Sequence, residues 1–347
     1  MGPLAWSCFL TALGLGTFLT LSSYHWLLAW MGLEINTLAI IPLLAYKHHP
    51  RAVEAATKYF LMQTAAAALI LFSSINNAWI SGEWDITNLT DPSSISLMTI
   101  ALSIKLGLAP FHFWLPEVLQ GSTLTCGLIL TTWQKLAPMS LMYMIAPNLN
   151  SPLLLTLATF SIMLGGWGGI NQTQTRKILA YSSIAHLGWM AAVMSINPPL
   201  AFFNLILYIL MTTSMFITFI ILSSTSISSL SFSWTKAPVI TALASLTLLS
   251  MGGLPPMSGF LPKLMIITEL IRQNALITAS LIILSALLSL FFYVRLLYFL
   301  TLTTYPNTFS SSTWWRTKPL TNTILVSLFL IYSALLLPVL QSIVNLF

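Results

Sequence analysis

The fold is decided by a stretch that interrupts a long apolar run: residues 251–263, MGGLPPMSGFLPK. Three glycines and three prolines stand in this stretch, so it cannot form a continuous helix. The residues on both sides, from 238 to 271, are nevertheless mostly apolar. In lipid, an interrupted backbone survives only where it is buried in protein or lines a hydrated cavity. We therefore interpret residues 238–271 as a discontinuous helix within a membrane bundle.

The composition of the whole chain also indicates a membrane protein. Of 347 residues, 13 are Lys or Arg and 7 are Asp or Glu, so 6% are charged, whereas an ordinary soluble domain has roughly 25%. Apolar residues make up 57% of the chain, and the mean hydropathy is +0.88. A soluble fold of this length could not cover its surface with so few charges. We predict a single membrane domain over residues 1–347.

The sequence lacks several motifs of metal and nucleotide binding, and their absence excludes classes of function. Cys8 and Cys126 are far apart and form no C-x-x-C pair, so we expect no zinc or iron–sulfur site on this chain. No glycine-rich phosphate-binding motif occurs, and residues 165–169, GGWGG, are interpreted as close helix packing or a helix end. The formal charge of +6 is scattered over loops, which favours lipid orientation over nucleic-acid binding. No cofactor or metal is expected to bind here.

The apolar runs predict the number of membrane helices, because a spanning helix needs about 20 largely apolar residues. Such runs predict about eleven transmembrane helices, at 3–22, 25–45, 56–75, 95–116, 124–146, 152–170, 176–195, 199–222, 238–271, 275–301 and 320–345. Proline and glycine interrupt two of them, at 95–116 and 238–271. The pattern predicts an all-α polytopic protein in which residues 320–345 form a C-terminal transmembrane helix.

The distribution of Lys and Arg over the short loops predicts the orientation of the chain. Eight basic residues belong to loops on the N-terminal side: Lys47, Arg51, Lys58, Arg176, Lys177, Lys236, Arg316 and Lys318. The opposite loops carry one basic residue, Arg272, together with three acidic ones, Glu83, Asp85 and Asp91. We therefore expect the N-terminus to face the cytoplasm or matrix, and eleven helices place the C-terminus on the opposite side.

Four charged residues fall in the interior of the predicted membrane region rather than near its loops: Glu34, Lys105, Lys135 and Lys263. Arg295 lies within snorkelling reach of a helix end. A lysine at the bilayer centre costs about 2.5–3.5 kcal/mol, so each lysine needs a physical reason to be there. One interpretation is a buried ion pair between Glu34 and a lysine that fastens two helices. One carboxylate cannot neutralise three lysines, however, so at least two ammonium groups remain unpaired. Intramembrane groups that can gain or lose a proton in this way are typical of a proton relay.

His186 and His112 are weaker candidates for the same relay. A histidine in a helix is most often a packed, hydrogen-bonded side chain, but imidazole can also exchange protons near neutral pH. Both interpretations stay open for both residues. Glu117 is expected to cap a helix or to form an ion pair near the surface, and Glu269 is compatible with either environment.

The two interrupted spans occupy corresponding places in the chain. They are the fourth and the ninth spans, and this odd offset means that they cross the membrane in opposite directions. Lys105 lies near the first break and Lys263 near the second. Paired interrupted helices in matching halves indicate an inverted-repeat transporter with its ion path at the breaks. We predict a first five-helix repeat over 3–146 and a second, inverted one over 152–301.

At these residues the sequence resembles a known family. The stretches that carry the resemblance are 30–36 (WMGLEIN), 105–118 (KLGLAPFHFWLPEV), 133–138 (WQKLAP), 180–188 (AYSSIAHLG) and 252–260 (GGLPPMSGF). They resemble the subunit 2 family of mitochondrial NADH–ubiquinone oxidoreductase, respiratory complex I. That family consists of antiporter-like membrane subunits related to Mrp-type sodium/proton antiporters. The resemblance covers essentially the whole chain.

The resemblance implies a fold and a role for each buried charge. It implies two inverted five-helix bundles with discontinuous helices, each forming half of a proton channel. Glu34 then corresponds to the membrane glutamate, Lys105 to the lysine of the first broken helix, and Lys135 to the middle residue. Lys263 corresponds to the terminal residue at the second broken helix, and His186 to the histidine near the centre of the polar axis.

The resemblance also implies a setting for the chain. It implies a proton-translocating subunit of complex I in the mitochondrial inner membrane, with its N-terminus in the matrix and its C-terminus in the intermembrane space. FMN, iron–sulfur clusters and ubiquinone are expected to bind elsewhere in the complex. The expected partners are lipids and other membrane subunits of complex I, including neighbouring antiporter-like and small channel subunits, with no nucleic acid. Two alternatives remain, a stand-alone Mrp-type cation/proton antiporter and a non-pumping assembly scaffold.

Overall fold

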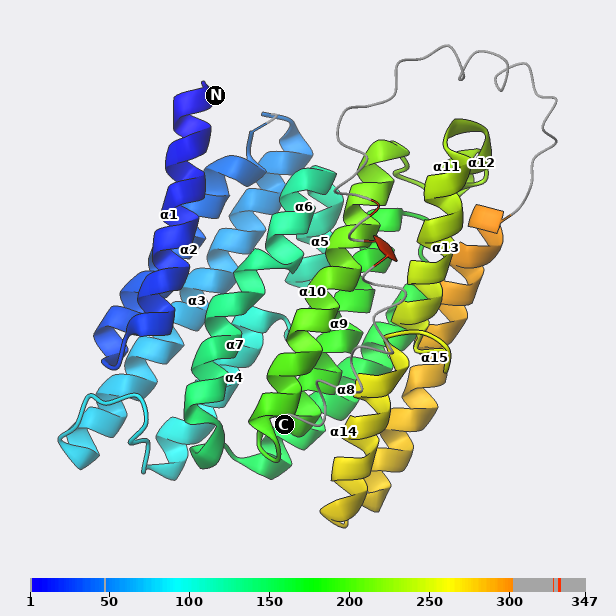
Figure 1. Ribbon diagram of the computed structural model, residues 1–347. Helices are drawn as coiled ribbons and strands as arrows, with labels where there is room; N and C mark the ends of the chain where they lie inside the picture. Colours follow the sequence, from blue (N-terminus) through cyan, green and yellow to red (C-terminus); the bar gives the residue numbers. More distant parts are fainter. Residues whose placement is uncertain (1, 47, 302–326, 328–329, 332–347) are drawn as a thin grey trace. The chain divides into compact units, whose positions relative to one another are not determined.

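The computed structural model describes residues 2–46, 48–301, 327 and 330–331. Within these residues the chain is helical, and the only β-type pairings are two isolated bridges (Figure 1). The helices are α1 (Pro3–Ser22), α2 (Trp26–Leu44), α3 (Pro50–Ser81), α4 (Pro92–Leu106), α5 (Trp114–Gly121), α6 (Leu124–Thr131), α7 (Trp133–Ile145), η1 (Ala146–Asn148), α8 (Ser151–Ile170), α9 (Thr175–Met194), α10 (Pro198–Ile221), α11 (Ile227–Leu230), α12 (Ser233–Lys236), α13 (Pro238–Gly252), α14 (Phe260–Arg272) and α15 (Leu276–Thr301). The prediction of an all-α protein is confirmed for this part of the chain.

The chain divides into two compact units. The first unit consists of Met1–Ser161 and Met190–Pro198, and the second of Ile162–Trp189 and Pro199–Phe347. Helices α1 to α7 therefore belong to the first unit and α10 to α15 to the second, while α8 and α9 contribute to both.

Most of the predicted spans coincide with helices. Six helices in the described part are long and apolar enough to cross a membrane: α1, α2, α3, α8, α10 and α15. To within one residue at each end, the spans predicted at 3–22, 25–45, 152–170, 176–195, 199–222 and 275–301 match α1, α2, α8, α9, α10 and α15. The C-terminal span predicted at 320–345 lies outside the described residues.

Helix α3 (Pro50–Ser81) extends beyond the predicted span of 56–75 at both ends, and buried polar side chains support the extension at its C-terminal end. Asn77 is fully buried, and its side-chain amide donates to the Asn88 carbonyl oxygen at 3.0 Å. The Asn77 amide oxygen in turn accepts from the Thr90 backbone N–H at 3.2 Å. These bonds satisfy a polar residue that hydropathy alone would place outside a helix.

The span predicted at 124–146 is a single helix in the sequence interpretation but two helices, α6 and α7, in the structure. They meet at Thr132, whose hydroxyl donates to the Leu128 carbonyl oxygen at 2.7 Å. The neighbouring Thr131 hydroxyl donates to the Gly127 carbonyl oxygen at 2.9 Å. Such back-bonds can bend a helix, and at Thr132 the backbone departs from helical values, with φ −109° and ψ −69°.

In the first unit, α1 lies beside α2, and the two helices cross at a pair of glycines (Figure 1). A Cβ atom on Gly16 would lie 2.8 Å from the Gly32 carbonyl oxygen, and one on Gly32 would lie 2.8 Å from the Gly16 carbonyl oxygen. The backbones therefore approach too closely for any larger residue, as small residues permit between membrane helices.

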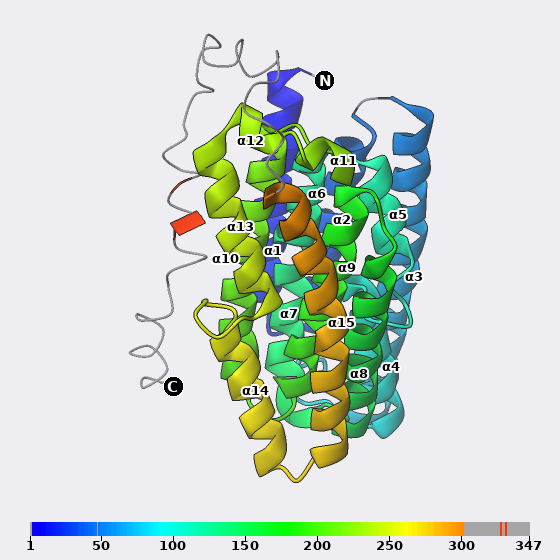
Figure 2. The ribbon, with the colours of Figure 1, turned by 90° about the vertical axis from the view of Figure 1, so that its right-hand side faces the viewer.

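In the second unit, α13 and α14 lie one after the other along α15 (Figures 1 and 2). The glycine-rich stretch 165–169 in α8 allows close contact with the neighbouring helices. A Cβ on Gly165 would lie 2.8 Å from the Ala185 backbone nitrogen in α9, and one on Gly166 would lie 2.9 Å from the Leu288 Cβ in α15. The stretch therefore packs closely against its neighbours and also stands at the C-terminal end of α8, so both parts of its interpretation are confirmed.

Candidate functional site

The two predicted breaks are present, and they have nearly the same local backbone. Helix α4 is capped at its C-terminal end by Gly107, with φ 78° and ψ 40°, and α13 by Gly253, with φ 80° and ψ 43°. Both helices have 15 residues and begin with proline in the first turn. Left-handed conformations of this kind strongly favour glycine, which explains why both interruptions begin at one. The expectation of two interrupted helices is confirmed.

A lysine ammonium holds the carbonyl end of each of these half-helices. In the first unit, Lys135 Nζ on α7 donates to the Leu106 carbonyl oxygen at the end of α4. In the second unit, Lys263 Nζ on α14 donates to the carbonyl oxygens of Met251 at 3.1 Å and Gly252 at 2.9 Å. A cation at a helix C-terminus satisfies carbonyls that have no partner within the helix and interacts favourably with the helix dipole.

Each of these two lysines also lies beside an indole ring. Lys135 Nζ is 5.4 Å from the Trp114 ring centroid, and Lys263 Nζ is 5.9 Å from the Trp189 ring centroid. Both distances are within the range of a cation–π interaction. In each unit, the C-terminal end of a helix and the face of an indole ring together stabilise one buried ammonium.

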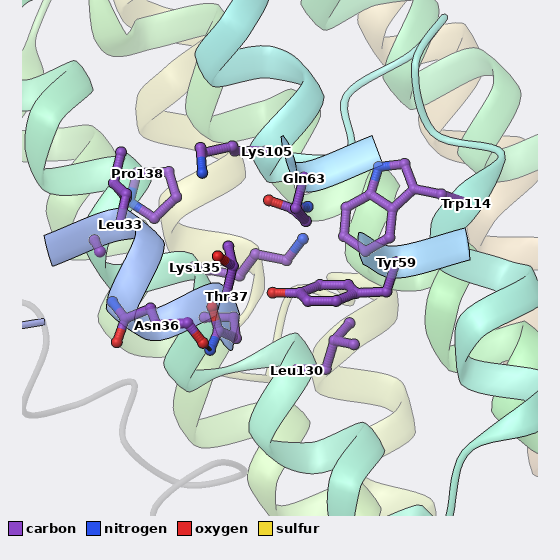
Figure 3. A pocket seen from close by; sticks show the side chains of 12 residues that line it. Leu33, Asn36, Thr37, Tyr59, Gln63, Lys105, Trp114, Leu130, Lys135 and Pro138 are labelled. Carbon is purple, nitrogen blue, oxygen red and sulfur yellow. Dashed lines mark hydrogen bonds between the residues drawn. The ribbon is translucent and has the colours of Figure 1, made fainter. Parts of the chain in front are cut away.

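Lys105 occupies a different position, at a small polar cavity in the first unit. The cavity has a volume of about 10 Å³, close to what one water molecule needs. Its lining consists of Leu33, Asn36, Thr37, Tyr59, Gln63, Lys105, Trp114, Leu130, Gln134, Lys135, Ala137 and Pro138. Figure 3 shows the polar ends of Lys105, Gln63, Tyr59 and Lys135 converging on it. Lys105 is 4% exposed, and its Nζ has no hydrogen-bond partner among the described residues.

Glu34 lies near this cavity without touching a lysine. Its Oε2 accepts from the Thr37 hydroxyl at 2.9 Å, and its charge acts on both Lys105 and Tyr59. No nitrogen of Lys105 comes within 4.0 Å of its carboxylate, since the ion pairs in the described part all lie elsewhere. The interpretation of Glu34 as one half of a direct buried ion pair is therefore wrong for these residues.

In the second unit, His186 is placed beside Lys263 and two tyrosines. His186 is 5% exposed, and its Nε2 lies 3.2 Å from the Tyr293 hydroxyl. The Tyr208 ring is tilted against the imidazole at a centroid distance of 5.7 Å. Lys263 is close enough for its charge to act on the histidine.

The remaining candidates lie apart from these clusters. His112 is buried in the segment between α4 and α5, with its ring 4.3 Å from that of Phe113. Glu117 pairs with Lys58 at 2.6 Å, and both side chains are about half exposed, so its expected surface ion pair is confirmed. Glu269 pairs with Arg272 at 2.8 Å on the same helix.

Sequence reasoning missed four polar side chains that the structure brings to the candidate residues. Tyr59 and Gln63 stand one turn apart on α3 and face the cavity, a spacing that could have been noticed. Tyr208 and Tyr293 gave no signal, because a tyrosine in an apolar helix usually belongs to the core or to a membrane interface. Among the described residues, no group of three or more His, Cys, Asp and Glu side chains lies together as metal ligands would.

Comparisons with known proteins assign this arrangement to a family. Residues 23–289 match the family described as "NADH:quinone oxidoreductase/Mrp antiporter, TM", and residues 290–344 match "NADH dehydrogenase subunit 2 C-terminus". The chain is 61% identical over 339 residues to NADH-ubiquinone oxidoreductase chain 2 of Xenopus laevis, covering 98% of each chain. It is 57% identical to the protein of the same name from Polypterus ornatipinnis, covering 100% of each chain.

Solved structures agree with this assignment. A chain of respiratory complex I from Thermus thermophilus is similar with a TM-score of 0.81 and 27% identity, covering 95% of this chain and 79% of that one. A chain of the Mrp complex from Dietzia sp. DQ12-45-1b has the same fold, with a TM-score of 0.75 at 15% identity over 83% of this chain and 59% of that one. With two family matches that together extend from residue 23 to 344 and relatives that are more than half identical over nearly its full length, the chain belongs to the NADH-ubiquinone oxidoreductase chain 2 family.

Proposed function

We propose that the buried charges of this chain form a proton-transfer route, with Glu34, Lys105 and Lys135 in the first unit and His186 and Lys263 in the second. As a member of its family, the chain is an antiporter-like membrane subunit of respiratory complex I in the mitochondrial inner membrane. It is part of a multi-subunit enzyme that oxidises NADH and reduces ubiquinone. Proton transfer by these particular residues is our inference.

The observation that carries the proposal is the environment of Lys105. A buried ammonium without a hydrogen-bond partner is costly, and a structural lysine would normally have one. Lys105 instead faces a cavity with room for about one water molecule, and it feels the charge of Glu34 without pairing with it. A group held in this way can change its protonation state when the charge of Glu34 moves or is neutralised.

The mechanism that fits this geometry is electrostatic coupling. A charge change in a neighbouring subunit alters the interaction between Glu34 and Lys105, and Lys105 then exchanges a proton with the cavity. Lys135 and His186 pass protons on, and Lys263 is the terminal group. Moving one charge against a membrane potential costs about 2.3 kcal/mol per 100 mV. The lysines cannot supply this energy, so it has to come from redox chemistry in other subunits.

Three further features of the chain belong to the proposal. The matching ends of α4 and α13 support two inverted repeats at 3–146 and 152–301 within a bundle of eleven transmembrane helices. The excess of Lys and Arg in loops on one side supports an N-terminus in the matrix and a C-terminus in the intermembrane space. His112, buried at the first break, is a further candidate member of the route.

The proposal also includes what binds to the chain and what does not. We propose that neighbouring antiporter-like and small channel subunits of complex I, together with lipids, cover its apolar faces. FMN, the iron–sulfur clusters and ubiquinone are proposed to bind on other subunits, because this sequence carries no motif that would hold them.

Replacing Lys105 by alanine tests the proposal directly. In complex I whose assembly has been confirmed by native electrophoresis, Lys105→Ala is expected to lower proton-coupled turnover by about fivefold, the scale of a typical coupling free energy. The measurement is the rate of proton translocation together with the rate of NADH oxidation in sealed membrane vesicles, with Lys58→Ala as the control at an exposed lysine.

Each alternative function makes a different prediction for the same preparation. A non-pumping scaffold would show unchanged turnover and an unchanged proton-to-NADH ratio in both Lys105→Ala and Lys263→Ala, and that result would overturn the relay. A stand-alone cation/proton antiporter would catalyse ion flux as a purified chain in liposomes, without NADH or any other subunit.

A further inference from the structure

The indole of Trp114 contacts three neighbouring helices of the first unit, α3, α4 and α7. Trp114 is the first residue of α5 and is 5% exposed. Its Nε1 donates to the Ile104 carbonyl oxygen at 3.2 Å, in the last turn of α4. Its ring lies 5.4 Å from Lys135 Nζ, and the Tyr59 ring packs against it at a centroid distance of 5.8 Å. The same indole lines the cavity that Lys105 faces (Figure 3).

The way in which α4 ends explains why the Ile104 carbonyl can accept this bond. In a continuous α-helix that carbonyl would accept from the N–H four residues later, which is that of Leu108. Because Gly107 is left-handed, the Leu108 N–H instead donates to the Ser103 carbonyl oxygen, at 2.9 Å. The Ile104 oxygen accepts from the Gly107 N–H at 3.1 Å, and its second lone pair accepts from the indole.

The position of this bond matters because of the residue that follows it. The Ile104 carbonyl and the backbone nitrogen of Lys105 belong to one planar peptide unit, so Trp114 holds the peptide from which Lys105 projects. On the other side of Lys105, the Leu106 carbonyl oxygen accepts from Lys135 Nζ. Lys105 thus stands between two anchored carbonyls. One is held by the indole N–H, and the other by an ammonium that lies against the same indole.

We propose that Trp114 is a positioning residue for Lys105 and Lys135: its Nε1–H fixes the peptide that directs Lys105 into the cavity, and its ring face holds the ammonium of Lys135. This inference rests on the proposed function, since it assumes that the two lysines transfer protons. Trp114 itself neither gains nor loses a proton, because an indole N–H is only a donor. The two actions belong to different parts of the ring, so substitutions can separate them.

The first test is Trp114→Phe in assembled complex I, because this change removes the N–H and keeps an aromatic face toward Lys135. We expect proton-coupled turnover in sealed vesicles to fall by about fivefold, the scale of one net hydrogen bond. Trp114→Leu removes the face as well and should cause about a further tenfold loss, the scale of a desolvated cation–π interaction. The matched control is Trp30→Phe, which removes an indole bond to the Ala67 carbonyl oxygen at 3.1 Å, between α2 and α3, and should leave turnover unchanged.

A Lys105→Ala background separates positioning from mere packing. Trp114→Phe should cause no additional loss there, because the peptide that the indole holds no longer directs an ammonium. Trp114→Leu should still cause its further tenfold loss, since that loss arises at Lys135. A side chain that only filled space would cause the same losses with and without Lys105. The Trp114→Phe comparison decides the test by itself if Trp114→Leu does not assemble.

The outcomes distinguish this inference from the proposed function. If Lys105→Ala lowers turnover and Trp114→Phe does not, the positioning role is wrong and the relay stands. An equal loss from Trp114→Phe with and without Lys105, or an equal loss from Trp30→Phe, would likewise overturn the positioning role alone. Normal turnover in Lys105→Ala would remove Lys105 from the relay and would overturn both.

Discussion

Complex I that carries Lys263→Ala in this chain is expected to lose about a hundredfold of its proton-coupled turnover, the lower end of what a positioned acid–base group contributes. The reason is that one ammonium has two tasks in the second unit. Lys263 is the proposed terminal proton carrier beside His186, and its Nζ also satisfies the Met251 and Gly252 carbonyl oxygens at the end of α13. Alanine removes the carrier and leaves both carbonyls without this donor.

The measurement compares NADH oxidation and proton translocation in sealed vesicles after the amount of assembled complex has been matched. Arg272→Ala is the control, because Arg272 lies on the same helix with its side chain 74% exposed, and among the described residues its ion pair is with Glu269. Lys263→Arg should restore the bonds to the helix end but not full turnover, since arginine does not release its proton. Full proton translocation by assembled Lys263→Ala would rule out Lys263 as a proton carrier.

The largest expected effect on assembly comes from Gly259→Ala, at the start of α14. A Cβ atom at this position would overlap the carbonyl oxygen of Ser250 in α13, a backbone atom that cannot turn away as a side chain could. Overpacking a tight core costs about 1–3 kcal/mol even where side chains can adjust. We expect about a tenfold or greater loss of assembled complex, measured by native electrophoresis of the membranes.

Gly252→Ala, seven positions earlier in the chain, provides the matched control. A Cβ there would meet its nearest neighbour, the Tyr293 Cβ, at 3.9 Å, which is ordinary van der Waals contact. Alanine also favours the helical conformation over glycine. Normal assembly of Gly252→Ala together with loss of Gly259→Ala would locate the restriction at the contact with Ser250. Equal assembly of the two variants would contradict it.

The sequence predicted the elements of this fold well where the signal was hydropathy or glycine. The αL ends of α4 and α13 fall at Gly107 and Gly253, within the stretches that proline and glycine had marked. The interruption at Thr132 was missed, because a threonine within an apolar run looks like any other helical residue. The interruption is visible only in the backbone of the structure, where Thr132 has φ −109° and ψ −69°.

The charged residues of the site could be predicted from the sequence, but the groups that they contact could not. Lysines and a glutamate stand out in an apolar sequence, so Glu34, Lys105 and Lys263 could be singled out by composition alone. The hydrogen-bond partners of the buried lysines could not be predicted in this way. The Leu106 carbonyl oxygen that accepts from Lys135, for example, is a backbone atom without any sequence signature. The contact between Tyr293 and His186 was hidden as well, because the two residues are more than 100 positions apart in the sequence.

The lysine-held ends of α4 and α13 have a consequence for how charge and shape communicate in this chain. An ammonium donates stronger hydrogen bonds than a neutral amine. The protonation of the lysine and the position of the half-helix that it binds are therefore thermodynamically linked. Linkage of this kind is reciprocal. A half-helix that is pulled away from its lysine changes how firmly that lysine keeps its proton, and a lysine that gives up its proton loosens the half-helix by the same free energy. In each unit, therefore, displacement of the half-helix and deprotonation of its lysine are coupled, so that either change promotes the other.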